Sequence, residues 1–195
     1  MKPTLDLTFT HSWTVEVLEK RPLIAPARQF VYPQQTEEVE RGALELLVKP
    51  ATGNAFLATC ALGFADSTAS TGIWSCPNPD WLCAVSGGYA YLINTLDPQQ
   101  WSMVPYRPVL SVRVLAEQQL LLFIGHHSIL ALGRDGQAWE SARLSWEGIE
   151  ITDVVGDTLC GLGWDLMTDN DVPFAIDLKT GEHTGGAEKF PPRPE

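Results

Sequence analysis

The feature that most constrains this chain is a succession of short apolar segments separated by turn residues, with almost no helical periodicity. Leu5, Leu7 and Phe9 alternate with polar residues, and segment 13–18 repeats the same two-residue period. The one charged stretch with helical character, 36–41, is too short to form a stable helix alone. The pattern therefore predicts an all-β fold.

From residue 77 onward, the strands fall into three similar units, each with two apolar strands joined by a turn and followed by a polar turn. Asp97, Asp135 and Thr180 occupy the same turn position in these units, 38 and 45 residues apart. A period of about 40–50 residues with four short strands per unit is typical of propeller blades. One unit cannot bury both faces of its sheet, so the units are expected to stack.

The turn segments of these units carry a recognisable motif. Residues 175–182 read AIDLKTGE, 131–139 form a shortened variant, and 92–101 form a more degraded copy. The motif resembles the A-x-D-x-x-T-G repeat of quinoprotein-type (PQQ-like) β-propellers, over roughly residues 77–187.

The resemblance implies roles for a few residues. The turn of Thr180 and Gly181 would join the third and fourth strands of a blade, and Trp101 and Trp139 would dock against neighbouring blades. The last copy departs from the repeat, with Gly185 where a Trp is expected. No cofactor is expected, because the quinone-binding residues of the family are not identifiable in this chain.

Three units and a divergent N-terminal half are too few for a ring of six to eight blades. We therefore expect antiparallel four-stranded meanders in a small or open β-propeller-like array, with residues 1–195 forming a single all-β domain. Within it, 1–72 is a divergent N-terminal β-sheet unit, 73–187 holds the three blade-like repeats, and 188–195 is an extended Pro-rich tail. Segment 22–33, with three prolines, is expected to be a connector.

Composition limits the class of partner and the compartment. Thirteen Lys and Arg oppose 24 Asp and Glu among 195 residues, which gives a net charge of −11 and argues against nucleic acid or an anionic membrane as partner. No segment approaches the roughly 18 apolar residues that a membrane span needs, and we identify no signal peptide. The four cysteines contain no C-x-x-C pair, which favours free thiols and a cytoplasmic location.

Two aromatic residues and a histidine pair are the candidate binding residues. Trp74 and Trp81 flank the loop 76–80, which two prolines rigidify, and they could offer an exposed aromatic platform; the alternative is packing between strands. His126 and His127 lie at a predicted hairpin tip, where imidazole could serve as a ligand or an acid–base group. No acidic neighbour completes a site there, so an ordinary exposed turn is the alternative.

Asp165, Asp169 and Asp171 form an oxygen-rich cluster and are the candidate metal ligands. Calcium prefers six to eight oxygen ligands, but the loop lacks the Glu that ends an EF-hand. The alternative is a polar loop between strands.

The residues favour one function and leave a second open. No catalytic set and no G-x-S-x-G motif occurs, so we assign no catalytic residue and favour a non-catalytic binding protein. Its acidic surface would bind a protein partner, one with a basic patch, through loops. The alternative is a metal-assisted hydrolase or lyase on a propeller-like face. Open sheet edges also allow a homodimer.

Overall fold

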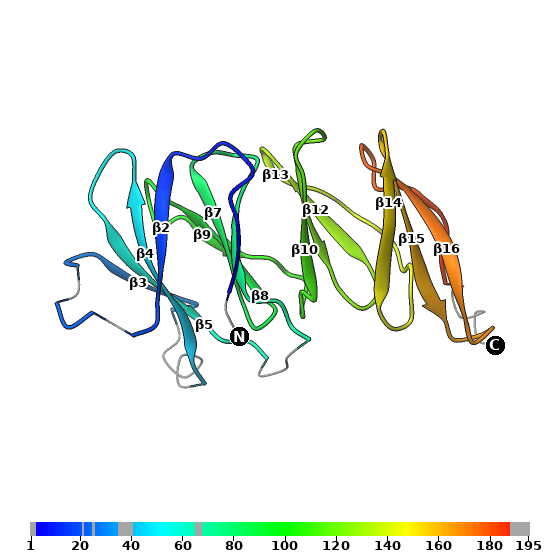
Figure 1. The fold of residues 1–195 in the computed structure, drawn as a ribbon, viewed down its shortest axis with the longest axis horizontal. Helices are drawn as coiled ribbons and strands as arrows, with labels where there is room; N and C mark the ends of the chain where they lie inside the picture. Colours follow the sequence, from blue (N-terminus) through cyan, green and yellow to red (C-terminus); the bar gives the residue numbers. More distant parts are fainter. Residues whose placement is uncertain (1–2, 21, 25, 35–40, 65–67, 188–195) are drawn as a thin grey trace, which may run out of the picture.

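The chain forms an open row of β-sheets. A computed structural model describes residues 3–20, 22–24, 26–34, 41–64 and 68–187, and in these ranges seventeen strands form four sheets. Figure 1 shows the sheets side by side, from the N-terminal half to the C-terminal sheet. The expected all-β, open propeller-like array of antiparallel four-stranded sheets is thereby confirmed. No helix in the described ranges is long and apolar enough to cross a membrane.

The first sheet contains one strand that the sequence did not predict. Its spatial order is β2 (Trp13–Leu18), β4 (Ala43–Pro50), β5 (Phe56–Ala61) and β3 (Gln29–Tyr32). Strand β3 pairs with β5 in parallel. Because β3 lies within segment 22–33, the expectation that this segment is only a connector is wrong for these four residues. An edge strand needs ladder hydrogen bonds on one side only, which is compatible with the neighbouring prolines.

The second sheet also takes a strand from the N-terminal segment. Its order is β1 (Thr4–Asp6), β6 (Gly72–Ser75), β7 (Trp81–Ser86), β8 (Tyr89–Asn94) and β9 (Trp101–Met103). Strands β6 to β9 form an antiparallel meander, whereas β1 pairs with β6 in parallel. Residues 4–6 therefore extend the second sheet rather than the first.

The third and fourth sheets are simple meanders. The third consists of β10 (Ser111–Leu115), β11 (Leu120–Ile124), β12 (Ile129–Gly133) and β13 (Gly136–Glu140). The fourth consists of β14 (Ile149–Val155), β15 (Thr158–Asp165), β16 (Asn170–Asp177) and β17 (His183–Gly185). Asp97, Asp135 and Thr180 each lie in the turn before the last strand of the second, third and fourth sheets, as their spacing predicts.

Three hydrophobic clusters join the four sheets in sequence. The first and second sheets share a cluster that includes Leu46 and Ile93, and the second and third share one that includes Val85 and Phe123. A third cluster, around Leu122, joins the third and fourth sheets. Each inner sheet therefore buries apolar side chains on both faces, as stacked blades require.

The two tryptophans with expected docking roles contact opposite neighbours. The Trp139 Nε1–H donates a 2.7 Å hydrogen bond to the carbonyl of Leu178, which lies in the turn after β16 of the fourth sheet. Gly181, at φ +76°, lies so close to this ring that an added Cβ would be 2.8 Å from it. Trp101 instead lies 5.3 Å, between ring centroids, from Tyr32 of the first sheet.

The Trp139 contact gives a first stability test. Trp139→Phe removes the donor to a buried carbonyl, so we expect the free energy of unfolding to fall by about 1–3 kcal/mol. Urea denaturation measures the change. Gln137→Ala, on an exposed position of the same strand, should change stability by less than about 0.5 kcal/mol. Equal stability of both variants would contradict a stabilising role for this hydrogen bond.

Candidate functional site

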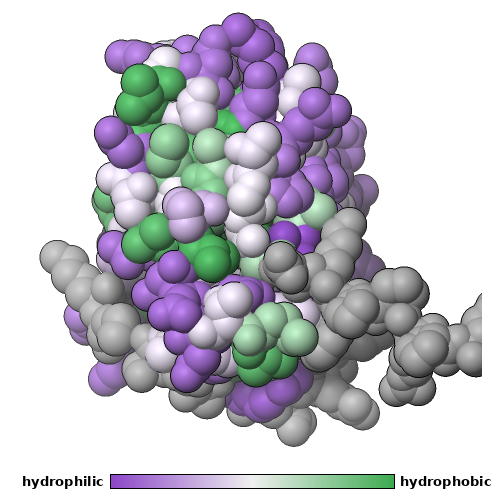
Figure 2. Space-filling model, turned by 90° about the vertical axis from the view of Figure 1, so that its right-hand side faces the viewer, coloured by the Kyte–Doolittle hydropathy of each residue, from purple (hydrophilic) through white to green (hydrophobic). Residues whose placement is uncertain are grey.

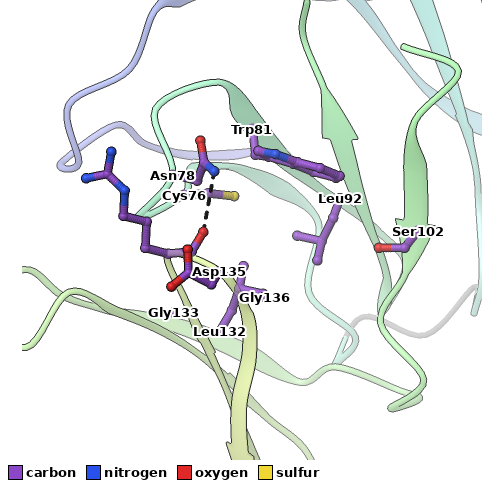
Figure 3. Close-up of a pocket in the computed structure, with 10 residues that line it drawn as sticks. Cys76, Asn78, Trp81, Leu92, Ser102, Leu132, Gly133, Asp135 and Gly136 are labelled. Carbon is purple, nitrogen blue, oxygen red and sulfur yellow. Dashed lines mark hydrogen bonds between the residues drawn. The ribbon is translucent and has the colours of Figure 1, made fainter. Parts of the chain in front are cut away.

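A cavity of about 410 Å³ opens between the second and third sheets, and we call it the seam pocket. Its volume falls in the range of small-ligand sites, about 300–1,000 Å³. The residues that line it are Cys76, Asn78, Trp81, Leu92, Ser102, Leu132, Gly133, Arg134, Asp135 and Gly136. Figure 3 shows the Trp81 ring and the Leu92 side chain on one side, with Leu132 and Asp135 across from them.

Hydrogen bonds hold the loop that carries Trp81. The Ser12 hydroxyl donates to the Asp80 carboxylate at 2.7 Å, and the Ser12 amide donates to the carbonyl of Pro79 at 3.0 Å. On the other side, the Thr95 amide donates to the carbonyl of Asp80 at 2.8 Å. The Trp81 amide donates to the carbonyl of Asn78, which closes the loop on itself. The loop is thus ordered before any ligand binds, which lowers the entropic cost of binding.

The opposite wall is the turn between β12 and β13. The Asn78 side-chain amide donates a 3.4 Å hydrogen bond to the carbonyl of Arg134, and this bond links the two walls, as the dashed line in Figure 3 shows. The base of the pocket is apolar, with Cys76, Leu92 and Leu132 among its lining residues. Arg134 and Asp135 add a cation and a carboxylate on this turn. An apolar base beneath polar groups suits an apolar or aromatic group that carries a polar end.

Two side chains of the seam pocket, Cys76 and Ser102, carry groups that could act as nucleophiles. Burial raises the pKa of the Cys76 thiol, so it stays protonated at neutral pH and is a poor nucleophile. Ser102 supplies a hydroxyl, but no histidine is among the residues that line the pocket in the described part of the chain. A serine nucleophile needs an adjacent base, and the pocket provides no imidazole for that role.

Of the two tryptophans predicted to be exposed, only Trp81 lines the pocket. Trp74 is 3% exposed and belongs to the core between the second and third sheets, so the expectation that it is exposed is wrong. Both residues belong to the second sheet, but Trp74 lies in β6, whose four residues are all buried, whereas Trp81 begins β7 at the loop. The difference in exposure between the two tryptophans follows from their positions in the strands. The sequence alone does not reveal that exposure.

The histidine pair lies far along the sheet from the seam pocket. His126 and His127 form the turn before β12, whereas the pocket lies at the turn after it. Their carbonyls accept hydrogen bonds from the amides of Gly148 and Leu144, at 3.0 and 2.7 Å. The turn therefore anchors the segment that leads into the fourth sheet.

The three aspartates proposed as metal ligands do not converge. Asp165 is 1% exposed, and its Oδ2 accepts hydrogen bonds from the amide and hydroxyl of Thr168. Asp169 takes a positive φ of 52° in the turn, and Asp171 pairs opposite Trp164 on the exposed face of the sheet. Among the described residues, no group of three or more His, Cys, Asp or Glu could hold a metal ion. The prediction of a metal cluster at these residues is therefore wrong.

Sequence reasoning missed most of the seam pocket. Leu92, Ser102 and Leu132 come from three different strands of two sheets, and nothing local marks them as neighbours of Trp81. A signal existed for the second wall, because Asp135 holds the turn position that recurs along the chain. Stacked repeats place that turn beside the loops of the neighbouring sheet.

Comparison with protein families and curated proteins gives no function for this site. No family model matches this sequence, and no curated protein matches it either. The resemblance of the turn segments to PQQ-like repeats stays a prediction from the sequence.

Cysteine reactivity tests the burial of the pocket base. Cys60, Cys76 and Cys83 are buried, and burial raises the pKa of each thiol, whereas Cys160 is partly exposed. We expect native protein at pH 8 to react with a disulfide reagent at Cys160 alone. All four thiols should react after unfolding in guanidinium. A Cys160→Ser variant should show no fast thiol, and a fast thiol in that variant would contradict the buried position of the other three.

Proposed function

We propose that this chain is a non-catalytic binding protein that holds a side chain of a protein partner in the seam pocket. One observation carries the proposal. An ordered loop presents the aromatic side chain of Trp81 on one side of a largely apolar cavity of about 410 Å³, and a charged turn lies on the other side. An indole beside an apolar pocket is a common anchor at protein interfaces. The loop and turn together match a binding surface made of loops on a β scaffold.

The overall charge favours a basic partner. The chain carries a net charge of −11, which attracts a positively charged surface and raises the rate of encounter. Asp135 on the turn offers a carboxylate to such a partner, while Trp81 offers a face for an aliphatic, aromatic or cationic side chain. We expect binding to weaken as salt rises.

The setting we propose is the cytoplasm. Support comes from the four cysteines, which are all free in the structure. A reducing compartment keeps such thiols unpaired. We also propose that the turn segments derive from PQQ-like blade repeats. Support comes from the three equivalent turns, each of which precedes the last strand of its sheet.

Partner capture with matched variants tests the binding site. Immobilised wild-type protein is exposed to native host lysate at low and at moderate salt, and the bound proteins are identified by mass spectrometry. We expect one stoichiometric partner whose capture falls about tenfold or more with Trp81→Ala. Ser102→Phe, which places a bulky side chain at another position of the pocket lining, should reduce capture as well.

Trp146→Ala is the matched control. Trp146 is also half-buried, and it stacks with the Arg143 guanidinium at 4.3 Å in the connector before the fourth sheet, outside the seam pocket. Its removal should leave capture unchanged. A partner retained equally by all three variants, or no partner at either salt, would refute the proposed site.

A further inference from the structure

The fourth sheet ends the row, and among the described residues no other sheet covers its outer face. Its inner face contributes Leu159, Phe174 and Ile176 to the cluster shared with the third sheet. Side chains alternate between the faces of a strand, so Cys160, Leu162 and Trp164 of β15 point the other way. We call these three half-buried residues the outer stripe. Figure 2 views this end of the molecule and shows hydrophobic residues interspersed among hydrophilic ones on it.

The outer stripe has the apolar character of sheet faces that pack against a neighbouring sheet in the rest of the row. In the third sheet, β11 is fully buried because its alternate residues pack against two neighbours: Leu121 and Phe123 against the second sheet, and Leu122 against the fourth. Strand β15 also has apolar residues on both faces, but in the described part of the chain only its inner face packs against another sheet. The final unit of a stacked array normally has a polar outer face. The outer stripe departs from that expectation.

The first sheet, at the other end of the row, differs in this respect. Leu57 and Thr59 lie on the face of β5 that points away from the second sheet, yet they are 0% and 1% exposed. That end is therefore already covered by the chain itself. The two ends of the row are not equivalent, and the fourth sheet is the open one.

Carboxylates border the outer stripe on both sides. The strand register places Glu150 opposite Leu162 and Asp153 opposite Cys160 on β14, and Asp171 opposite Trp164 on β16. Directly opposed residues point to the same face of a sheet. Residues 149–185, which span this sheet, contain eight Asp and Glu and one Lys, a net charge of 1 − 8 = −7. That Lys, Lys179, already pairs with Asp157 at 2.5 Å.

We propose that the outer face of the fourth sheet docks a partner protein through an apolar sheet face whose margins carry Lys or Arg. An apolar centre with a polar border is the usual anatomy of a protein interface. The negative border selects a partner of opposite charge, because like charges brought together across an interface oppose association. A second copy of this chain would place the same carboxylates against each other, and the covered first sheet leaves no complementary end.

A designed peptide and the reactivity of Cys160 test this surface without knowledge of the natural partner. The probe is a backbone-cyclised β-hairpin with Val and Leu on one face and Lys at its margins. Because Cys160 lies within the outer stripe, bound probe should slow its alkylation by about tenfold or more when the probe is in excess of its dissociation constant. Added salt should reverse the protection, since the border contacts are exposed.

Matched variants and a matched peptide sharpen the test. Leu162→Ser should abolish protection, whereas Leu96→Ser, at an exposed apolar position of the second sheet, should not. Asp153→Asn combined with Asp171→Asn should weaken binding with no cost to folding, because both side chains are exposed. A hairpin with Glu in place of Lys should give no protection.

The outcomes separate this proposal from its alternatives. No protection by the Lys hairpin, or equal protection by the Lys and Glu hairpins, would overturn it. Concentration-dependent protection of Cys160 without any peptide, together with a dimer in sedimentation, would identify a second copy as the occupant and would also overturn it. Trp81→Ala should leave protection intact, so this surface is tested independently of the seam pocket.

Discussion

The packing of the second sheet between the first and the third sets the position of everything else in this molecule. Leu82 and Ala84 of β7 face the first sheet, while Cys83 and Val85 face the third. Every residue of β7 after Trp81 is buried, so neither face of this strand contacts solvent. Because apolar burial on both faces stabilises the second sheet, that sheet cannot leave the row without exposing two hydrophobic clusters.

Both proposed surfaces follow from this stacked arrangement. The seam pocket forms where two packed sheets meet at their loop ends, so its walls come from segments that are distant in sequence. The outer stripe exists because the row ends at the fourth sheet with a strand suited to a neighbour on each side. One surface is a gap within the stack and the other is its uncovered end.

The sequence predicted the class of fold and the recurrent turns because both depend on local periodicity. It did not predict that β1 and β3 pair in parallel with strands much later in the chain, since such pairing is set by non-local register. At the site, Trp81 was identified from its Pro-rich loop. Trp74, with the same chemistry, was misjudged because the packing of the third sheet buries it.

The sequence alone determined an acidic all-β chain of repeated strand–turn units that must stack, because alternation and turn residues act over a few positions. Tertiary structure alone decided which faces are covered. It separated Asp165 from Asp171, brought Leu132 and Arg134 opposite Trp81, and left Leu162 without a neighbouring sheet. Whether a residue is exposed depends on which element packs against its strand. The residues of the strand itself do not show whether that neighbour is present.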